Sequence, residues 1–168
     1  MRTDVKRRGW TISAEGNDLA DRFLESVFFT GNGRMGARGY PAYRPIRRPL
    51  DAGLFLAGFY DRISESTELT DFVNLPTPIW YQIRLNGRIP AIPSHLSRAL
   101  DLRTGLLTFR YRLSIADDWV DVQEQRFFSL AKPSFLFQRL EFQGRGQVEL
   151  LAGIPSVIYG LLGIYLLN

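Results

Sequence analysis

Apolar and polar residues alternate with a period of two along much of the chain. Between Gly105 and Ile115, every second position is apolar: Leu107, Phe109, Tyr111 and Leu113. Successive side chains of a β-strand point to opposite faces of a sheet, so this spacing predicts a strand with one buried face. Further strands are predicted in "ESVFF" (25–29), "GLFLAGFY" (53–60), "PIWYQIRL" (78–85), "WVDVQEQRFFSL" (119–130), "SFLFQRLEFQ" (134–143) and "QVELLAGI" (147–154).

Two of these segments predict which side chains share a face. In the segment 119–130, the shared face comprises Val120, Val122, Phe128 and Leu130. In the segment 134–143, one face comprises Leu136, Gln138, Leu140 and Phe142, and the other comprises Phe135, Phe137, Arg139 and Glu141. The pair Asn86-Gly87 stands between two apolar runs, which is the strongest short signal for a hairpin.

Helical patterns are few. One short helical turn is predicted within 14–26, "AEGNDLADRFLES", and another within 93–100, "PSHLSRAL". With roughly ten strands expected by this reading, the sequence predicts an all-β fold, an antiparallel β-sandwich of the super-sandwich type with little helix. We expect helix to account for less than about a fifth of the residues.

Composition agrees with one ordinary globular domain. The chain has 168 residues, 45% of them hydrophobic, and a formal net charge of +4. This excess of positive charge is too small to indicate a nucleic-acid partner. The chain has no cysteine and a single histidine, His95, which argues against a disulfide framework, thiolate chemistry and a multi-histidine metal site.

The two ends of the chain bear on its location. The first ten residues, "MRTDVKRRGW", are charged and lead into no apolar run, unlike a secretory signal. The last twelve, "VIYGLLGIYLLN", are apolar but reach only about half the roughly 20 residues of a membrane-spanning helix. We therefore expect a cytoplasmic protein with no membrane partner.

The glycine-rich stretch "GNGRMG" (31–36) has nearly the spacing of a dinucleotide-binding loop. Such a loop requires a helix directly after it, because the helix N-terminus binds the pyrophosphate. Gly39, Pro41 and Pro45 follow instead, and proline interrupts a helix. The stretch also lacks the Gly-Lys-Ser/Thr of a P-loop. We interpret it as a tight turn with residues at positive φ, followed by a strand.

Four carboxylates cluster in sequence at Asp117, Asp118, Asp121 and Glu124. Glycoside hydrolysis uses a pair of carboxylic acids on either side of a sugar. Asp117-Asp118 has the pattern of a turn before a strand, and charged residues are usually exposed. We interpret all four as solvated charges.

A basic stretch follows the glycines, with Arg44, Arg47 and Arg48 near Tyr40 and Tyr43. Arginine with aromatic residues suits contact with nucleic-acid phosphates or with the surface of a sugar-processing partner. The favoured interpretation is a solvated loop.

The isolated histidine and the tryptophans are also candidates. His95 has no nucleophile and acid at a recognisable spacing, so a surface or capping histidine is the better interpretation. Trp10, Trp80 and Trp119 have the aromatic faces needed to stack on sugar rings, but each adjoins a strand pattern, which favours core packing.

Five ordered segments resemble the N-terminal domain of glycoside hydrolase family 65, the family of maltose, trehalose and kojibiose phosphorylases and related hydrolases. They are "ESVFFTGNGRMGARG" (25–39), "GLFLAGFYD" (53–61), "LTDFVNLP" (69–76), "LDLRTGLLTFRY" (100–111) and "QRFFSLAKPSFLFQRLEF" (125–142). The sequence departs from the family pattern at Gln125, where glutamate is frequent, and at Arg34, where tyrosine is common.

The resemblance implies a β-sandwich over residues 1–153, with 154–168 as an atypical apolar tail. A truncated, frameshifted or engineered end would each explain that tail. In the family, catalytic and phosphate-binding residues lie in an (α/α)₆ barrel that follows the sandwich. The resemblance therefore implies no catalytic, cofactor-binding or metal-ligating residue in this chain and no cofactor. The implied partners are the barrel, a second copy of the chain, and the disaccharide and inorganic phosphate of the intact enzyme.

Two alternatives of other classes remain. One is a free-standing carbohydrate-binding or interaction module with exposed aromatic residues. The other is a nucleic-acid-binding β-domain that uses the Arg-rich loop, for which binding would depend strongly on salt.

Overall fold

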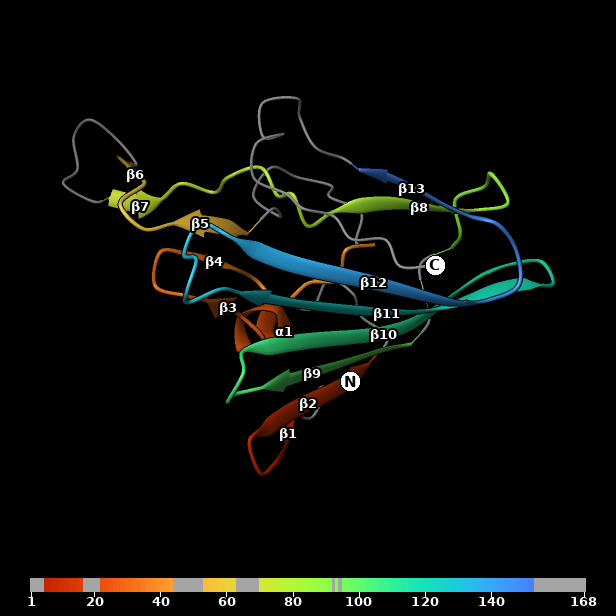
Figure 1. Ribbon diagram of the computed structural model, residues 1–168, viewed down its shortest axis with the longest axis horizontal. Helices are drawn as coiled ribbons and strands as arrows, with labels where there is room; N and C mark the ends of the chain where they lie inside the picture. Colours follow the sequence, from red (N-terminus) through yellow and green to blue (C-terminus); the bar gives the residue numbers. More distant parts are fainter. Residues whose placement is uncertain are drawn as a thin grey trace.

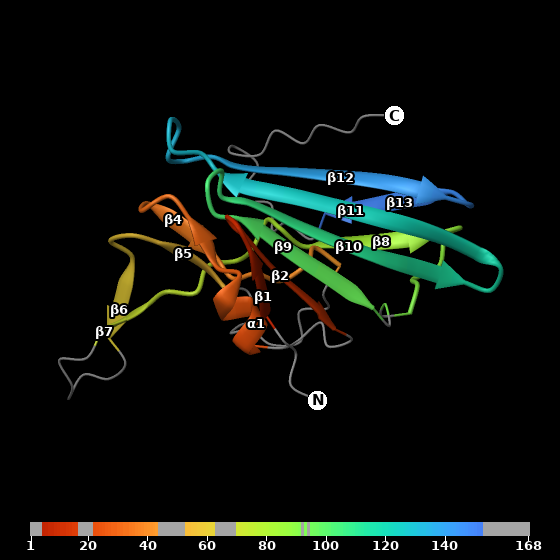
Figure 2. The same ribbon diagram turned by 90° about the horizontal axis from the view of Figure 1, so that it is seen from below.

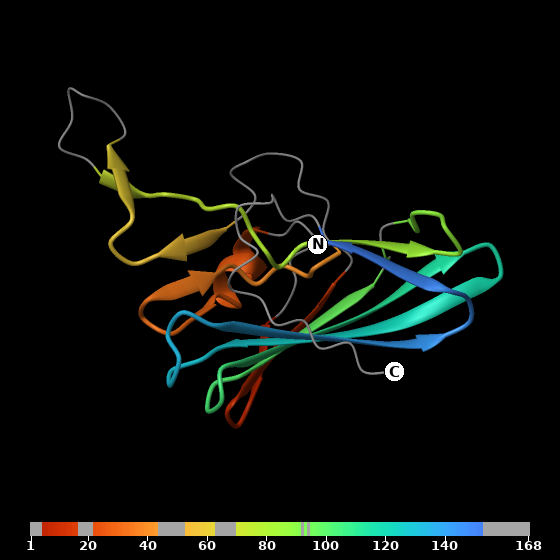
Figure 3. The same ribbon diagram turned by 45° about the horizontal axis from the view of Figure 1, so that its top comes forward.

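The computed structural model describes residues 5–16, 22–43, 53–62, 70–91, 93 and 95–152. One layer is a twisted six-stranded antiparallel sheet, and shorter strands with one helix lie against it (Figures 1 and 3). The order in the large sheet is β1 (Val5–Arg8), β2 (Thr11–Gly16), β9 (Leu96–Asp101), β10 (Leu106–Ile115), β11 (Asp118–Phe128) and β12 (Leu136–Gly144).

The second layer consists of separate short sheets. One pairs β8 (Tyr81–Leu85) with β13 (Val148–Ala152), and another has the order β3 (Thr30–Gly31), β4 (Met35–Ala37), β5 (Leu54–Leu56). A last hairpin pairs β6 (Tyr60–Arg62) with β7 (Thr70–Phe72) and projects from the body (Figures 2 and 3). The helix α1 (Arg22–Val27) is the only α-helix of the described residues, so the predicted antiparallel sandwich with little helix is confirmed.

Period-two patterning gives the large sheet its buried face. All four apolar positions predicted in β10 are buried, at 5% exposure or less. Phe109 pairs across the sheet with Glu124, and Leu113 pairs with Val120. The main core lies between this face and β8, where Ile83 and Leu85 are fully buried.

A second, smaller core lies where the ends of β11 and β12 meet β4 and β5. It consists of Ala37, Tyr40, Leu54, Ile79, Phe128 and Leu136. The prediction that Leu130 shares the face of Phe128 was wrong, because β11 ends at Phe128 and Leu130 is 79% exposed.

Two predicted elements have the opposite secondary structure. The expected strand 25–29 is largely the helix α1, because Leu24, Glu25 and Phe28 are buried at a helical spacing. The expected helical turn at 93–100 is mostly the strand β9, in which Leu96, Arg98 and Leu100 alternate as buried residues. In both segments a charged residue takes a buried position and hides the pattern. The helical turn expected within 14–26 is confirmed by α1.

Two further strand predictions need adjustment. The segment 53–60 holds two short strands, β5 and the start of β6, separated by a turn at Ala57–Gly58. The Asn86-Gly87 turn is present, with φ of 52° and 72° as a type I′ turn requires. However, the hairpin at this turn consists of a single bridge, Leu85↔Arg88, and β8 pairs along its length with β13. The apolar tail 154–168 lies outside the described residues.

Candidate functional site

The glycine-rich stretch is a turn between β3 and β4, as predicted. Gly33 has φ of +84°, and Asn32 fixes the turn from within, because its Oδ1 accepts the backbone N–H groups of Arg34 (3.1 Å) and Met35 (2.9 Å). The Asn32 amide also donates to the carbonyls of Ser129 (2.8 Å) and Pro133 (3.0 Å). These two backbone donors are therefore satisfied within the turn, and the turn is anchored to the loop between β11 and β12.

Gly36 and Gly39 have a different reason to be glycine. A Cβ at Gly36 would lie 2.6 Å from Cζ of Phe29, and one at Gly39 would lie 2.6 Å from the carbonyl oxygen of Phe28. Neither residue has positive φ, so the left-handed conformation expected for these two glycines is absent. Glycine is required at both positions because the residues that follow α1, Phe28 and Phe29, approach too closely to leave room for a Cβ.

Three of the four clustered carboxylates are solvated, as predicted. Asp117 lies in the turn with Ala116, and Asp118 begins β11 and accepts the Asn86 amide at 2.6 Å. Asp121 accepts Nε and Nη2 of Arg112 at 2.6 and 2.7 Å, and this hydrogen bonding lowers the pKa of Asp121.

The prediction that Glu124 is solvated was wrong. Its side chain is fully buried, because it occupies the same face of β11 as Val120 and Val122. Its Oε2 accepts the backbone N–H of Ala42 at 2.7 Å, and its Oε1 accepts Gln138 at 3.1 Å. Glu124 follows Val120 and Val122 at alternate positions of β11, and this alternation was the sequence signal for its burial.

Arg126 is the buried counter-ion of Glu124, two residues along the same face. Its Nη1 lies 3.4 Å from Oε1 of Glu124, and its Nη2 donates to the carbonyl of Arg38 at 2.9 Å. Its guanidinium also lies over the rings of Tyr40 (5.2 Å) and Phe109 (5.1 Å). Burial raises the pKa of Glu124 and lowers the pKa of Arg126, and their mutual attraction opposes both shifts.

We call Glu124, Arg126 and Gln138 the buried clamp. Together they bind the backbone of Arg38 and Ala42 on one side and of Ile79, through Gln138 at 3.3 Å, on the other. The clamp therefore ties two connecting segments of the second layer to β11 and β12. Because it is enclosed and hydrogen-bonded, it positions backbone and offers no exposed acid or base.

The predicted basic stretch divides into two parts. Arg44, Arg47 and Arg48 lie outside the described residues. Tyr40 and Tyr43 are buried, which contradicts their place in a solvated loop. The Tyr40 hydroxyl bonds to Thr77, and the Tyr43 hydroxyl donates to the carbonyl of Pro90, both at 2.5 Å.

His95 is exposed, as expected of a surface histidine. Trp10 is 55% exposed beneath Arg103, so its predicted core position was wrong. Trp119 is half-buried, with the guanidinium of Arg112 4.2 Å from its ring centroid, and Trp80 is half-buried.

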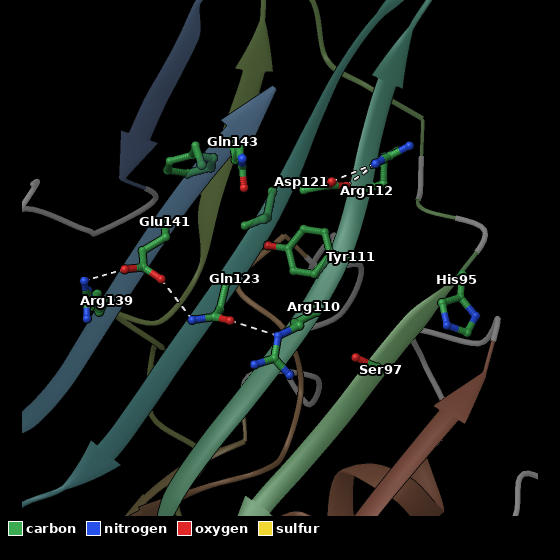
Figure 4. A pocket seen from close by; sticks show the side chains of 12 residues that line it. His95, Ser97, Arg110, Tyr111, Arg112, Asp121, Gln123, Arg139, Glu141 and Gln143 are labelled. Carbon is green, nitrogen blue, oxygen red and sulfur yellow. Dashed lines mark hydrogen bonds and ion pairs between the residues drawn. The ribbon is translucent and has the colours of Figure 1, made fainter. Parts of the chain in front are cut away.

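The outer face of the large sheet forms a polar trough of about 860 Å³ (Figure 4). Directly opposed residues of four strands cross it in the order Ser97, Arg110, Gln123 and Glu141. Arg110 donates to Gln123 (2.8 Å), Gln123 donates to Glu141 (2.9 Å), and Arg139 forms an ion pair with Glu141. These contacts hold the side chains in place, so the trough presents ordered hydrogen-bonding groups to a polar ligand or surface.

Sequence reasoning did not identify this trough, because its row of residues exists only once four strands are in register. Within the described ranges, no three His, Asp or Glu side chains come together as a metal site would require. No helix among those same residues is both long and apolar enough to cross a membrane.

Comparison with known proteins gives the family. Residues 14–156 match the family described as glycosyl hydrolase family 65, N-terminal domain. The chain belongs to this family. It is 26% identical over 123 residues to the trehalose 6-phosphate phosphorylase of Lactococcus lactis subsp. lactis (strain IL1403), a match that covers 67% of the chain and 16% of that relative.

A solved structure described as a kojibiose phosphorylase from the human microbiome has the same fold. It superposes with a TM-score of 0.72 and 15% identity over 87% of this chain. The match covers 21% of that chain, so this member of the family spans a small part of both phosphorylases.

Proposed function

We propose that the chain is the N-terminal β-sandwich of a glycoside phosphorylase or hydrolase that acts on α-glucosidic disaccharides in the cytoplasm. One observation carries the proposal: the family match spans nearly the whole chain, yet the chain covers only 16% of the phosphorylase it resembles in sequence. The reaction then belongs to the part of the enzyme outside this match, the (α/α)₆ barrel.

The surroundings of two carboxylates of β11 support the proposal that the reaction takes place outside this chain. An inverting glycosidase separates its two carboxyl groups by about 6.5–9.5 Å across an open space that holds sugar and water. In this chain Glu124 is enclosed with Arg126, and Asp121 is engaged by Arg112. Both carboxylates are therefore held in structural ion pairs with arginine, and the fully buried Glu124 is closed off from a sugar in solvent.

In the intact enzyme, one carboxylic acid of the barrel protonates the leaving oxygen while phosphate or water attacks from the opposite face. The sandwich packs against the barrel and forms one wall of the sugar pocket. Within the sandwich, the buried clamp fixes the connecting segments at Arg38–Ala42 and near Ile79 to the large sheet.

A carbohydrate-binding module is the second candidate function. The polar trough and the half-exposed ring of Trp10 favour it, because sugars bind through ordered polar groups and aromatic faces. Titration calorimetry with maltose, trehalose and kojibiose tests it. Saturable binding that Gln123→Ala weakens and Ile89→Ala leaves unchanged would favour this second candidate.

The test of the main proposal is an assay of the chain alone with maltose, trehalose or kojibiose and inorganic phosphate. We expect no glucose or glucose 1-phosphate above a buffer blank. Turnover that disappears when one residue of this chain is substituted would overturn the proposal.

A further inference from the structure

The strand β1 forms one edge of the large sheet and lies at the bottom of that sheet in Figure 1. It pairs with β2 on one side, and no described segment pairs with its other side. An edge strand presents a row of backbone N–H and C=O groups that its neighbour does not use. Within the described part of the chain, the outward groups of β1 are therefore left for a further extended strand.

This edge has a line of positive charge. Lys6, Arg7 and Arg8 follow one another along β1, and all three are exposed. Arg103, in the turn after β9, adds a fourth cation, whose guanidinium carbon lies 5.2 Å from the ring centroid of Trp10. Among the described residues, no carboxylate forms an ion pair with any of these four cations. Their charge is therefore left to attract an acidic partner.

The cations of β1 alternate between the two faces of the sheet. Arg7 is opposed to Ile12, which packs against the main core, so Arg7 belongs to the inner face. Lys6 and Arg8 belong to the outer face, because successive side chains of a strand alternate. A nucleic acid or a membrane is bound by cations gathered on one surface. An extended peptide beside β1, in the plane of the sheet, contacts both sets, so this arrangement favours a peptide.

An apolar contact lies at the end of the line of cations. The backbone N–H of Leu102 donates to the carbonyl of Trp10 at 2.8 Å, so the turns that follow β1 and β9 lie side by side. Trp10 is 55% exposed and Leu102 is 46% exposed. Tryptophan and arginine are enriched among the residues that contribute most to protein interfaces. We call β1 together with Trp10, Leu102 and Arg103 the basic edge.

We propose that the basic edge binds an extended acidic segment of a partner protein as an added antiparallel strand. Acidic residues of this segment lie opposite Lys6, Arg7 and Arg8, and an apolar residue packs against Trp10. Like charges directly opposite one another are destabilising, so a second copy of this edge is a poor partner and an acidic chain is a good one. The inference does not depend on the reaction of the intact enzyme, so it stands apart from the proposed function.

Fluorescence anisotropy of the whole chain with a labelled peptide, Leu-Glu-Glu-Glu-Val-Thr, tests the inference. We expect saturable binding that the double substitution Lys6→Glu and Arg8→Glu weakens at least about tenfold, because like charges then face each other. Arg88→Glu is the matched control, because Arg88 is exposed in the turn after β8, away from the basic edge. We expect this control to leave the affinity unchanged.

A charge exchange separates a lost contact from a lost fold. The peptide Leu-Lys-Glu-Lys-Val-Thr should bind the doubly substituted chain and not the wild type, while circular dichroism is the same for both chains. N-methylation tests the added strand itself, because only one alternate set of peptide amides faces β1. Methylating that set should abolish binding of the acidic peptide, and methylating the other set should leave it unchanged.

Three results with the peptides would overturn the inference: no saturable binding of the acidic peptide, an exchange that fails to restore binding, or equal effects of the two methylated sets. Oligothymidylate and phosphatidylserine vesicles give the remaining comparison. Binding of either one through Lys6 and Arg8, more tightly than the acidic peptide binds, would also overturn the inference.

Discussion

The large sheet and the short strands β3 to β7 differ in how they are stabilised. The large sheet has long strands, such as β10 and β11 with 10 and 11 residues, and each buries an alternating row over the main core. The strands β3 to β7 have only two or three residues each. Around these short strands, order comes from specific contacts: the Asn32 amide, the glycines packed against Phe28 and Phe29, and the buried clamp. Long strands tolerate a lost contact, whereas short strands depend on individual ones.

Removing the acid of the buried clamp should have the largest effect on stability. In Glu124→Ala, Arg126 stays buried without its counter-ion, and breaking a buried pair in this way costs about 3–5 kcal/mol. Urea denaturation measures the loss, with Asp121→Ala as the matched control from the exposed face of β11. A Glu124→Ala variant as stable as that control would contradict the function assigned to the clamp.

Two glycine substitutions should distinguish a position that needs glycine for lack of space from one that needs it for its positive φ. In Gly39→Ala the new Cβ meets backbone atoms of Phe28 that cannot move aside, so we expect a loss of about 1–3 kcal/mol, as in overpacked cores. In Gly33→Ala the space is empty within 4 Å, and the left-handed φ alone costs about 1–2 kcal/mol.

Thermal denaturation of the two variants, with phosphate binding measured in parallel, compares these effects. We expect the melting temperature of Gly39→Ala to be no higher than that of Gly33→Ala. We also expect the wild-type chain to show no saturable binding of ATP, NAD or phosphate. Micromolar binding of any of these ligands, together with normal melting of both variants, would contradict the structural interpretation of this stretch.

The smallest effect should come from the exposed pair Arg112–Asp121. Its hydrogen bonds lower the folded-state pKa of Asp121, so the pair stabilises the fold above the unfolded-state pKa and loses this as pH falls through the folded-state pKa. Because both side chains are about half-exposed and solvent screens their attraction, we expect the pair to contribute little to stability. Asp121→Asn should therefore lower stability slightly at neutral pH and not at all in strong acid, as measured by urea denaturation at several pH values.

The regular half of the fold could be predicted from sequence, because alternation in β10 to β12 reflects burial directly. The segments assigned the wrong secondary structure each bury a charged residue, Glu25 in α1 and Arg98 in β9. In the correctly predicted strand β11, the charged residue Glu124 is likewise buried and was misassigned to solvent. Hydrophobic patterns cannot show such residues, since their burial depends on partners elsewhere in the chain. The polar trough and the packing of Gly39 likewise depend on segments brought together by folding.

Domain replacement tests the central claim most directly, that this sandwich serves a catalytic portion outside it. The segment of the Lactococcus lactis trehalose 6-phosphate phosphorylase that matches this chain is replaced by the chain or deleted, and phosphorolysis of trehalose 6-phosphate is measured. We expect the deletion to abolish activity and the replacement to restore a measurable part of it, which Glu124→Ala in the replaced segment should remove again. A soluble, folded replacement with no more activity than the deletion would contradict the account.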